Sequence, residues 1–207
     1  LNTLLMAYTQ TSGRGRNDSR WVSDLGNLFL SIKFNSLKTS NPLILNYIIG
    51  IVVYDTIKFF LEKKTNLFIK WPNDLLIDKK KIAGILIDSI SKGNKVTELY
   101  AGIGINLKIV PSNISYETTC LKNENPIKIS RKNILNKLIF YFDYWENVFK
   151  SKNFLYITKC WMQRSLPINS KISFKDNNSI VNGIYKGINN TGSIRLLINN
   201  KEYNFFN

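Results

Sequence analysis

The sequence contains no histidine, and this absence removes several classes of enzyme. Catalysis by Ser-His-Asp and Cys-His arrangements is excluded, because both need an imidazole as the base. Zinc sites are disfavoured, since imidazole is a usual ligand of the metal and the chain has no Cys-x-x-Cys pair. Chemistry at neutral pH must therefore depend on lysine, arginine, aspartate, asparagine and backbone groups.

Cysteine is also scarce, with Cys120 and Cys160 as the two examples. Two cysteines do not make a disulfide framework, so we expect reduced thiols. The start of the chain, LNTLLMAYTQ, has no basic region before its short apolar stretch and does not resemble a secretory signal. These features predict a cytoplasmic protein.

Long apolar runs are missing as well. The longest one, at about residues 43–61, is interrupted by Asn46, Gly50, Asp55 and Lys58. A membrane helix needs about 20 predominantly apolar residues. The sequence therefore predicts no membrane span.

Acidic residues are few: 14 of them face 29 basic residues, which gives a net charge of +15. Such a charge is typical of nucleic-acid-binding proteins. However, lysine, asparagine and isoleucine are all abundant, as an AT-rich genome would produce, and just six basic residues are arginine. A basic nucleic-acid-binding protein stays an alternative, and in either case the positive field favours anionic ligands.

The 207 residues are 44% hydrophobic, which is enough to form a core in one large domain or in one domain with a small appendage. Hydrophobic periodicity predicts strands at 26–34, 67–70, 75–77, 82–90 and 95–107, and helices at 43–64, 131–150 and 154–164. Short polar turns join the strands between residues 67 and 107, which indicates an antiparallel meander. Residues 108–129 read as irregular.

The pattern changes after Pro167, where four short strands are expected at 171–174, 180–188, 193–198 and 202–206. We therefore predict an α+β fold, with a mixed, mainly antiparallel sheet flanked by helices in residues 1–164. A small β-barrel is predicted in residues 165–207.

The first candidate functional segment is Gln10-Thr11-Ser12-Gly13-Arg14-Gly15-Arg16, with Trp21 shortly after it. Glycines let the backbone approach a ligand closely, and guanidinium groups bind carboxylate or phosphate in a fork. Trp21 could cover an aromatic ring. A solvated basic loop is the alternative interpretation.

Three further segments carry polar or glycine residues at strand ends. Lys70-Trp71-Pro72-Asn73-Asp74 could position a phosphate and a divalent cation, or could simply form a turn. Lys81-Ile82-Ala83-Gly84 follows two other lysines, which is often just a solvated hairpin. The glycines of Gly102-Ile103-Gly104-Ile105-Asn106 suggest close approach of a ligand to a strand.

In this order and spacing, the four segments resemble the motifs of the biotin protein ligases, also called biotin–[acetyl-CoA-carboxylase] ligases. The resemblance extends over essentially the whole chain. It implies a catalytic domain like that of class II aminoacyl-tRNA synthetases, followed by an SH3-like C-terminal domain. It also implies a two-step reaction, in which biotin and ATP form biotinyl-5′-AMP on Mg²⁺. Biotin then passes to one lysine of the biotin carboxyl carrier protein of acetyl-CoA carboxylase.

The resemblance also assigns expected roles, with Lys81 and Arg14 as the catalytic residues. The expected biotin-binding residues are Gln10, Gly13, Arg14, Gly15, Arg16, Lys81, Gly84, Gly102 and Gly104. The expected nucleotide-binding residues are Arg16, Trp21, Asn73 and Asn106, and Asp74 is the expected metal ligand.

The sequence departs from the family pattern in two places. Family members carry a Ser-Thr-Asn segment that caps biotin upstream of the first loop, whereas nine residues precede Gln10 here. We therefore expect an N-terminally truncated catalytic domain that binds biotin weakly. Residues 17–19 read Asn-Asp-Ser instead of an arginine-glycine run, so weaker loop closure is expected.

No helix-turn-helix precedes the catalytic domain, so specific DNA binding is not expected. A related lipoate or octanoate transferase and an inactive remnant of the ligase stay as alternatives. Homodimer formation is left open.

Overall fold

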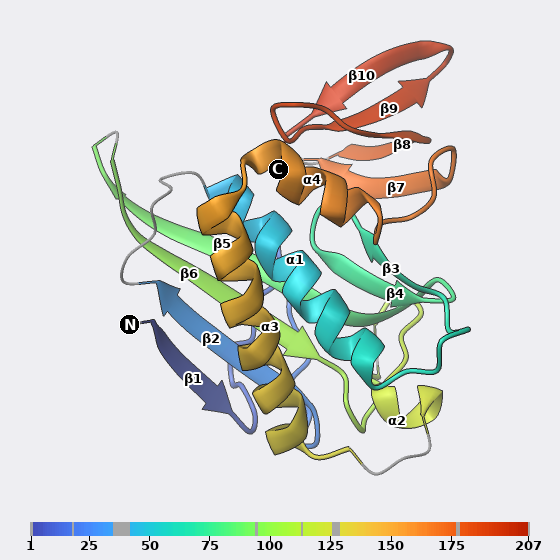
Figure 1. Cartoon of the computed structure of the whole chain (residues 1–207). Helices are drawn as coiled ribbons and strands as arrows, with labels where there is room; N and C mark the ends of the chain where they lie inside the picture. Colours follow the sequence, from blue (N-terminus) through green and yellow to red (C-terminus); the bar gives the residue numbers. More distant parts are fainter. Residues whose placement is uncertain are drawn as a thin grey trace.

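The computed structural model describes residues 2–17, 19–34, 42–93, 95–112, 114–125, 129–176 and 179–206. Its larger sheet has six strands in the order β1-β2-β6-β5-β4-β3 (Figure 1). The strands are β1 (Thr3–Ala7), β2 (Leu28–Phe34), β3 (Leu67–Lys70), β4 (Asp74–Ile77), β5 (Lys80–Lys92) and β6 (Lys95–Ile105). Among the described residues, every neighbouring pair in this order is antiparallel. The predicted meander is confirmed. The sheet was predicted to be mixed and mainly antiparallel, and its described strand pairs are all antiparallel.

Two long helices cover one face of this sheet (Figure 1). These two are α1 (Pro42–Phe59) and α3 (Arg131–Ser151). Two shorter helices are α2 (Leu121–Glu124) and α4 (Phe154–Met162). Helix α3 begins at Arg131, and Ser130 caps it as predicted: its Oγ accepts a hydrogen bond from the backbone N–H of Asn133 at 3.1 Å. This contact satisfies one of the free amides of the first helical turn.

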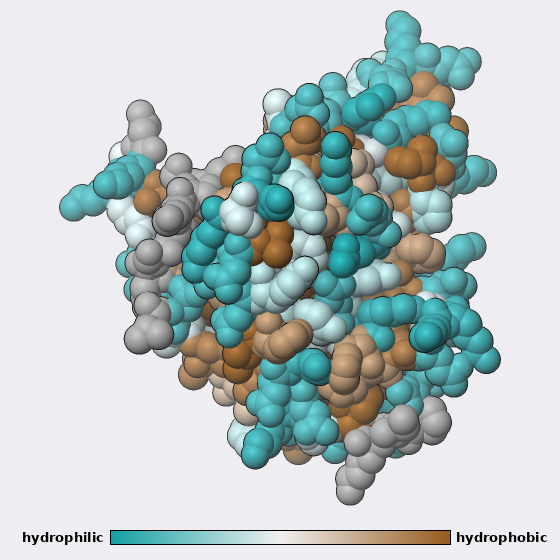
Figure 2. Space-filling model, viewed as in Figure 1, coloured by the Kyte–Doolittle hydropathy of each residue, from teal (hydrophilic) through white to brown (hydrophobic). Residues whose placement is uncertain are grey.

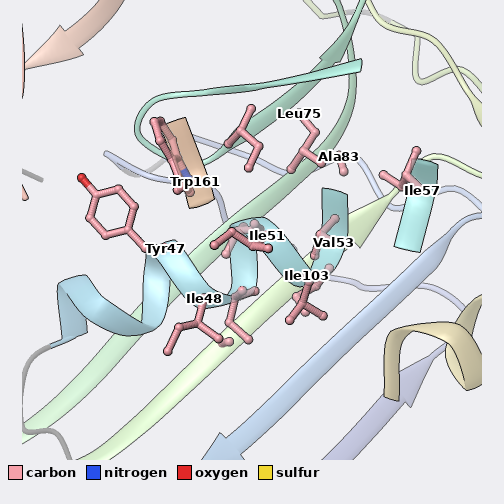
Figure 3. Close-up of a cluster of buried hydrophobic side chains, with 14 of the residues drawn as sticks. Tyr47, Ile48, Ile51, Val53, Ile57, Leu75, Ala83, Ile103 and Trp161 are labelled. Atoms are coloured by element: carbon pink, nitrogen blue, oxygen red, sulfur yellow. The ribbon is translucent and has the colours of Figure 1, made fainter. Parts of the chain in front are cut away.

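Helix α1 forms the centre of the hydrophobic core. Figure 3 shows its side chains, including Ile51 and Val53, packed near Ala83 and Ile103 of the sheet and Trp161 of α4. By length and hydropathy it is the one helix of the described residues that could cross a membrane, but 61% of it is buried inside the protein. The helical side of the surface is largely hydrophilic, with apolar residues in separate patches (Figure 2).

Helix α1 ends at Phe59, so the prediction that it continues to Lys64 was wrong. The Lys58 ammonium donates to the carbonyl oxygens of Glu62, Lys63 and Thr65, at 3.4, 3.0 and 2.8 Å. A lysine at a helix C-terminus binds carbonyls that lack an intrahelical partner. The following residues therefore turn around this ammonium instead of extending the helix.

Two elements were not predicted. Strand β1 lies at the sheet edge and pairs with β2, from Thr3 opposite Lys33 to Ala7 opposite Phe29. Helix α2 is a single short turn within the segment predicted as irregular. Helix α2, with four residues, is too short for helical periodicity to identify it.

The C-terminal residues form a second sheet of four antiparallel strands, in the order β10-β9-β8-β7. They are β7 (Lys171–Asp176), β8 (Ser179–Ile188), β9 (Ile194–Ile198) and β10 (Lys201–Phe205), close to the predicted strands. The Tyr47 hydroxyl of α1 donates to the carbonyl of Gly192 at 2.6 Å and joins this sheet to the core. The domain boundary at residues 164 and 165 stays a prediction.

Candidate active site

The candidate site lies on the face of the six-stranded sheet opposite the helices. Side chains alternate between the two faces of a strand. Ala83 and Ile103 belong to the core, so Gly84 and its cross-strand partner Gly104 lie on the open face. Glycines leave room there, and a cleft of about 960 Å³ lies along these strands.

The cleft brings together most of the predicted site residues. Its lining includes Gln10, Arg14, Gly15, Arg16, Trp21, Asn73, Asp74, Lys81, Gly84, Gly102 and Gly104. Two predicted residues lie outside this lining. Gly13 is a buried residue of the loop itself, and Asn106 lines a smaller pocket next to the cleft.

The glycine-arginine loop folds as a hairpin. The backbone N–H of Trp21 donates to the carbonyl of Gly13 at 2.9 Å, and that of Gly15 donates to Ser19 at 2.7 Å. A Cβ on Gly13 would come within 2.5 Å of the Trp21 carbonyl oxygen, so this position requires glycine. The hairpin thereby carries Trp21 back onto the sheet.

The Trp21 ring lies directly on the glycines of the sheet. A Cβ at Gly104 would come within 2.4 Å of two ring atoms, and one at Gly84 would come within 2.7 Å of a third. Trp21 was predicted to cover the adenine ring, and here it occupies the floor between the cleft and the small pocket.

Lys81 lies at the centre of the site. Its ammonium is 2.7 Å from a carboxylate oxygen of Asp74 and 5.0 and 5.2 Å from the ring centroids of Trp21 and Tyr116. Its side chain is 15% exposed. The structure thus holds a cation with a carboxylate partner between two aromatic faces, which attract cations.

The two arginines of the loop have different environments. Arg14 is exposed and forms an ion pair with Asp88 of β5, with 3.1 Å between Nη2 and Oδ2. Arg16 is more buried, and this burial lowers the pKa of its guanidinium, while the charges of Asp74 and Asp176 oppose that shift. Arg16 therefore lies in the electrostatic field of the Lys81–Asp74 pair.

Gln10 and Asn73 have structural partners in this conformation. Gln10 Oε1 accepts a hydrogen bond from the Ser23 hydroxyl at 2.8 Å. Asn73 Nδ2 donates to the carbonyl of Ile85, and the Asn73 carbonyl accepts from the Ile85 N–H at 2.9 Å. Asn73 thus ties the turn before β4 to β5, and its predicted nucleotide contact stays a prediction.

Asn106 is buried, and one of its polar atoms is free. Its Nδ2 donates to the Thr119 carbonyl at 3.0 Å, while Oδ1 has no hydrogen-bond partner among the described residues. A buried unsatisfied acceptor is costly and often marks a ligand position. The pocket around it, which Trp21 and Tyr116 also line, has about 10 Å³ of open volume.

Several lining residues were not predicted from the sequence. Tyr116 comes from the segment predicted as irregular, and its ring lies over Lys81. Phe174 and Lys175 of β7 also line the cleft, and the Phe174 ring contacts Trp71 with centroids 4.6 Å apart. No local sequence signal marks these residues, because they reach the site through the tertiary fold.

The described residues contain no group of three or more His, Cys, Asp or Glu side chains that could hold a metal ion. Asp74 lines the cleft, and it already pairs with Lys81. A metal ion at this position would need most of its ligands from a bound substrate.

Comparison with known proteins agrees with this geometry. Residues 2–106 match the family model for the biotin/lipoate A/B protein ligase family. A biotin–[acetyl-CoA-carboxylase] ligase of Paracoccus denitrificans is 27% identical over 201 residues, covering 93% of this chain and 82% of that protein. The bifunctional ligase/repressor BirA of Bacillus subtilis is 29% identical over 206 residues, which cover 95% of this chain and 62% of BirA.

Among solved structures, biotin protein ligase from Aquifex aeolicus in complex with biotin and ATP superposes with a TM-score of 0.83. It is 26% identical, and the match covers 98% of this chain and 84% of that chain. Since the family model spans the four predicted motifs, this protein belongs to the biotin/lipoate A/B protein ligase family.

Proposed function

We propose that the protein is a biotin protein ligase. It activates biotin with ATP to biotinyl-5′-AMP and transfers biotin to one lysine of the biotin carboxyl carrier protein of acetyl-CoA carboxylase. The observation that carries this proposal is the position of Lys81, which lies between the glycine-arginine hairpin and Asp74 in one cleft. The similar proteins include a biotin–[acetyl-CoA-carboxylase] ligase and a biotin protein ligase whose structure is a complex with biotin and ATP.

In the first step, a biotin carboxylate oxygen attacks the α-phosphorus of ATP and pyrophosphate leaves. The step brings two anions together, so fixed cations lower its barrier. Lys81 lies in the cleft floor, and Arg14 and Arg16 lie on the hairpin above it. The biotin carboxylate and the α-phosphate of ATP would replace Asp74 as the partners of the Lys81 ammonium.

The small pocket at Asn106 is the proposed adenine subsite. The free Oδ1 of Asn106 is a suitable acceptor for the exocyclic amino group of adenine. Trp21 borders both this pocket and the cleft, and it would shift off Gly104 to stack on the base. In the absence of nucleotide, the same ring fills the space that the base would take.

Mg²⁺ is included in the proposal as the ion that accompanies ATP. Such ions usually keep several waters and use one or two carboxylates together with substrate phosphates. Asp74 fits this role as a single carboxylate, because Lys81 would release it when substrate binds. The ion would supply charge neutralisation for the departing pyrophosphate.

In the second step, the amine of the acceptor lysine attacks the acyl carbon and AMP leaves. The mixed anhydride must be kept from water until then. The described residues of the hairpin, 14–17 and 19–21, line the cleft and would provide this cover. Both described cysteines are free, which fits the proposed cytoplasmic location, and the proposal requires neither specific DNA binding nor a homodimer.

The test is incubation of the purified chain with ATP, Mg²⁺ and biotin, octanoate or lipoate, each with and without a carrier domain. Mass spectrometry should detect biotinyl-AMP, and then a biotin mass on one carrier lysine. Preference for octanoate or lipoate would favour the transferase alternative. Failure to form any adenylate would contradict the proposal and favour an inactive remnant.

A further inference from the structure

The side chain of Asn27 binds one short backbone segment through four hydrogen bonds. Its Oδ1 accepts from the N–H groups of Leu107, Lys108 and Ile109 at 3.0, 3.1 and 3.1 Å. Its Nδ2 donates to the carbonyl of Ile109 at 3.0 Å. Asn27 is completely buried, and about 80 residues separate it from its partners in the sequence.

The bound segment is the start of the loop that borders the proposed adenine subsite. It follows Asn106 directly, and the loop then contributes Pro111, Ile114, Tyr116 and Thr118 to the small pocket. The other end of the loop returns to the same place, where the Leu121 N–H donates to the Asn106 carbonyl at 2.9 Å. The two ends of this loop are therefore fixed beside Asn106.

Asn27 itself lies outside the linings of the cleft and the small pocket, as the described residues define them. It precedes β2 and is held from the other side by Arg131, whose Nε donates to the Asn27 carbonyl at 2.9 Å. A Cβ on the preceding Gly26 would approach Ile109 to 3.1 Å, so the chain passes close to the bound segment. The contact thus connects the strand after the glycine-arginine hairpin to the loop after β6.

We propose that Asn27 is a positioning residue for the nucleotide subsite. By fixing residues 107–109, it sets the position of Asn106 and the start of the loop that carries Tyr116. Biotin binding in the glycine cleft does not use this contact. The inference depends on the proposed ligase function, because it concerns the ATP half of that site.

Asparagine suits this position because one oxygen must accept several amide hydrogens while a donor reaches a carbonyl. Alanine would remove the acceptor of three backbone N–H groups, of which that of Leu107 is buried and those of Lys108 and Ile109 are part-buried, and a buried N–H without a partner is unfavourable. Aspartate would keep the acceptor and lose the single donor. A carboxylate that accepts several backbone N–H bonds is well stabilised, so Asn27→Asp is the conservative variant.

The experiment compares Asn27→Ala and Asn27→Asp with Asn189→Ala. Asn189 is a matched control, because its Oδ1 accepts from the backbone N–H groups of Thr191 and Ser193 in a loop of the C-terminal sheet. Biotin affinity is measured by calorimetry without ATP, and the KM for ATP by pyrophosphate exchange. Hydrogen exchange of the 107–119 peptide gives a readout that does not depend on activity.

For Asn27→Ala we expect a KM for ATP raised tenfold or more, biotin affinity within twofold of wild type, and faster exchange in residues 107–112. Asn27→Asp should keep most of the ATP affinity that Asn27→Ala loses. Asn189→Ala should change neither the KM for ATP nor the affinity for biotin. If Asn27→Ala does not fold, Asn27→Ser replaces it, because one hydroxyl can accept a single amide and should give an intermediate increase.

An unchanged KM for ATP in folded Asn27→Ala, or in Asn27→Ser where it replaces that variant, would overturn the inference, as would equal losses of biotin and ATP binding. Neither result would contradict the proposed function, because that proposal is tested by the activity of the wild-type chain.

Discussion

The ammonium of Lys81 lies 2.7 Å from the Asp74 carboxylate, in a cleft that its neighbours Lys79 and Lys80 do not line. Both neighbours are exposed, and Lys79 has a positive φ of 70° in the turn between β4 and β5. Lys81 begins the stretch of β5 that leads to Gly84, so the turn leaves one of three consecutive lysines in the site. The catalytic role that the family resemblance assigns to Lys81 stays a prediction, and its position in the cleft is compatible with that role.

Lys81→Ala should therefore lower adenylate formation by about a hundredfold or more, since removal of one preorganised group that stabilises transition-state charge has effects of that order. Lys79→Ala and Lys80→Ala serve as controls with the same loss of charge and should stay within about twofold of wild type. Biotin-dependent pyrophosphate exchange measures all three. Equal losses in the three variants would mean that the overall positive field, not Lys81, supports the reaction.

Arg14 and Asp88 provide a second test, because the ion pair between them is exposed. An exposed pair contributes less than about 1 kcal/mol to folding, so Asp88→Asn should leave stability and biotin affinity nearly unchanged. Arg14→Ala should weaken biotin binding about tenfold or more, because a hydrogen bond to a charged group is worth roughly 1.5–3 kcal/mol.

Calorimetry with biotin compares the two variants with the wild type. A similar loss in Asp88→Asn and Arg14→Ala would indicate that the ion pair, and not a contact with biotin, holds the loop in place.

The fold could largely be predicted, because its main elements carry strong periodic or turn signals. The meander follows from apolar runs separated by polar turns such as residues 78–79, and helix α3 follows from Ser130 and the apolar stripe after it. The end of α1 could not be predicted. The turn that follows it is held by hydrogen bonds from the Lys58 ammonium to three carbonyl oxygens of residues 62–65, and these contacts leave no periodic signal in the sequence.

The site was predictable where motifs carry it and not elsewhere. The glycine and lysine positions in β5 and β6 were expected from the family resemblance, and these residues line the cleft. Tyr116 and Phe174 could not be found, because their proximity to Lys81 and Trp71 arises from the packing of a loop and of the second sheet. The different environments of Arg14 and Arg16 also depend on side-chain packing, which the sequence does not encode locally.

Tyr185 predicts a dependence of stability on alkaline pH. Burial raises its pKa to about 12, and its hydroxyl lies 3.2 Å from Ser165 Oγ. The unfolded chain releases the phenolic proton near pH 10, before the folded chain does, so this contribution to stability is complete below pH 10 and is lost as pH rises toward 12. About two pKa units correspond to roughly 2–3 kcal/mol.

Urea unfolding of wild type and Tyr185→Phe at pH 9 and pH 11.5 tests this expectation. The wild type should lose more stability than the variant between the two pH values. Equal losses would mean that the Tyr185 phenol reaches solvent in the folded protein.

A side chain on the open face of β6 has different consequences at Gly104 and at Gly102. At Gly104 it would displace the Trp21 ring, and at Gly102 it would only narrow the cleft. A Cβ at Gly104 would come within 2.4 Å of the Trp21 ring, whereas one at Gly102 would meet Leu86 at an ordinary 3.7 Å. Gly104→Ala must therefore displace Trp21 and should cost about 1–3 kcal/mol of stability, as overpacking does. It should also lower adenylate formation tenfold or more, because the displaced ring borders the proposed adenine subsite.

Gly102→Ala should keep wild-type stability and the position of Trp21, although its methyl group narrows the cleft and should raise the KM for biotin. The chain has four tryptophans, so the indole N–H resonance of Trp21 is assigned with Trp21→Phe and then followed in both alanine variants. It should move in Gly104→Ala and stay in Gly102→Ala. An unmoved resonance in Gly104→Ala would show that the ring does not rest on Gly104 in solution, and Trp21 would then have no part in closing the adenine subsite before nucleotide binds.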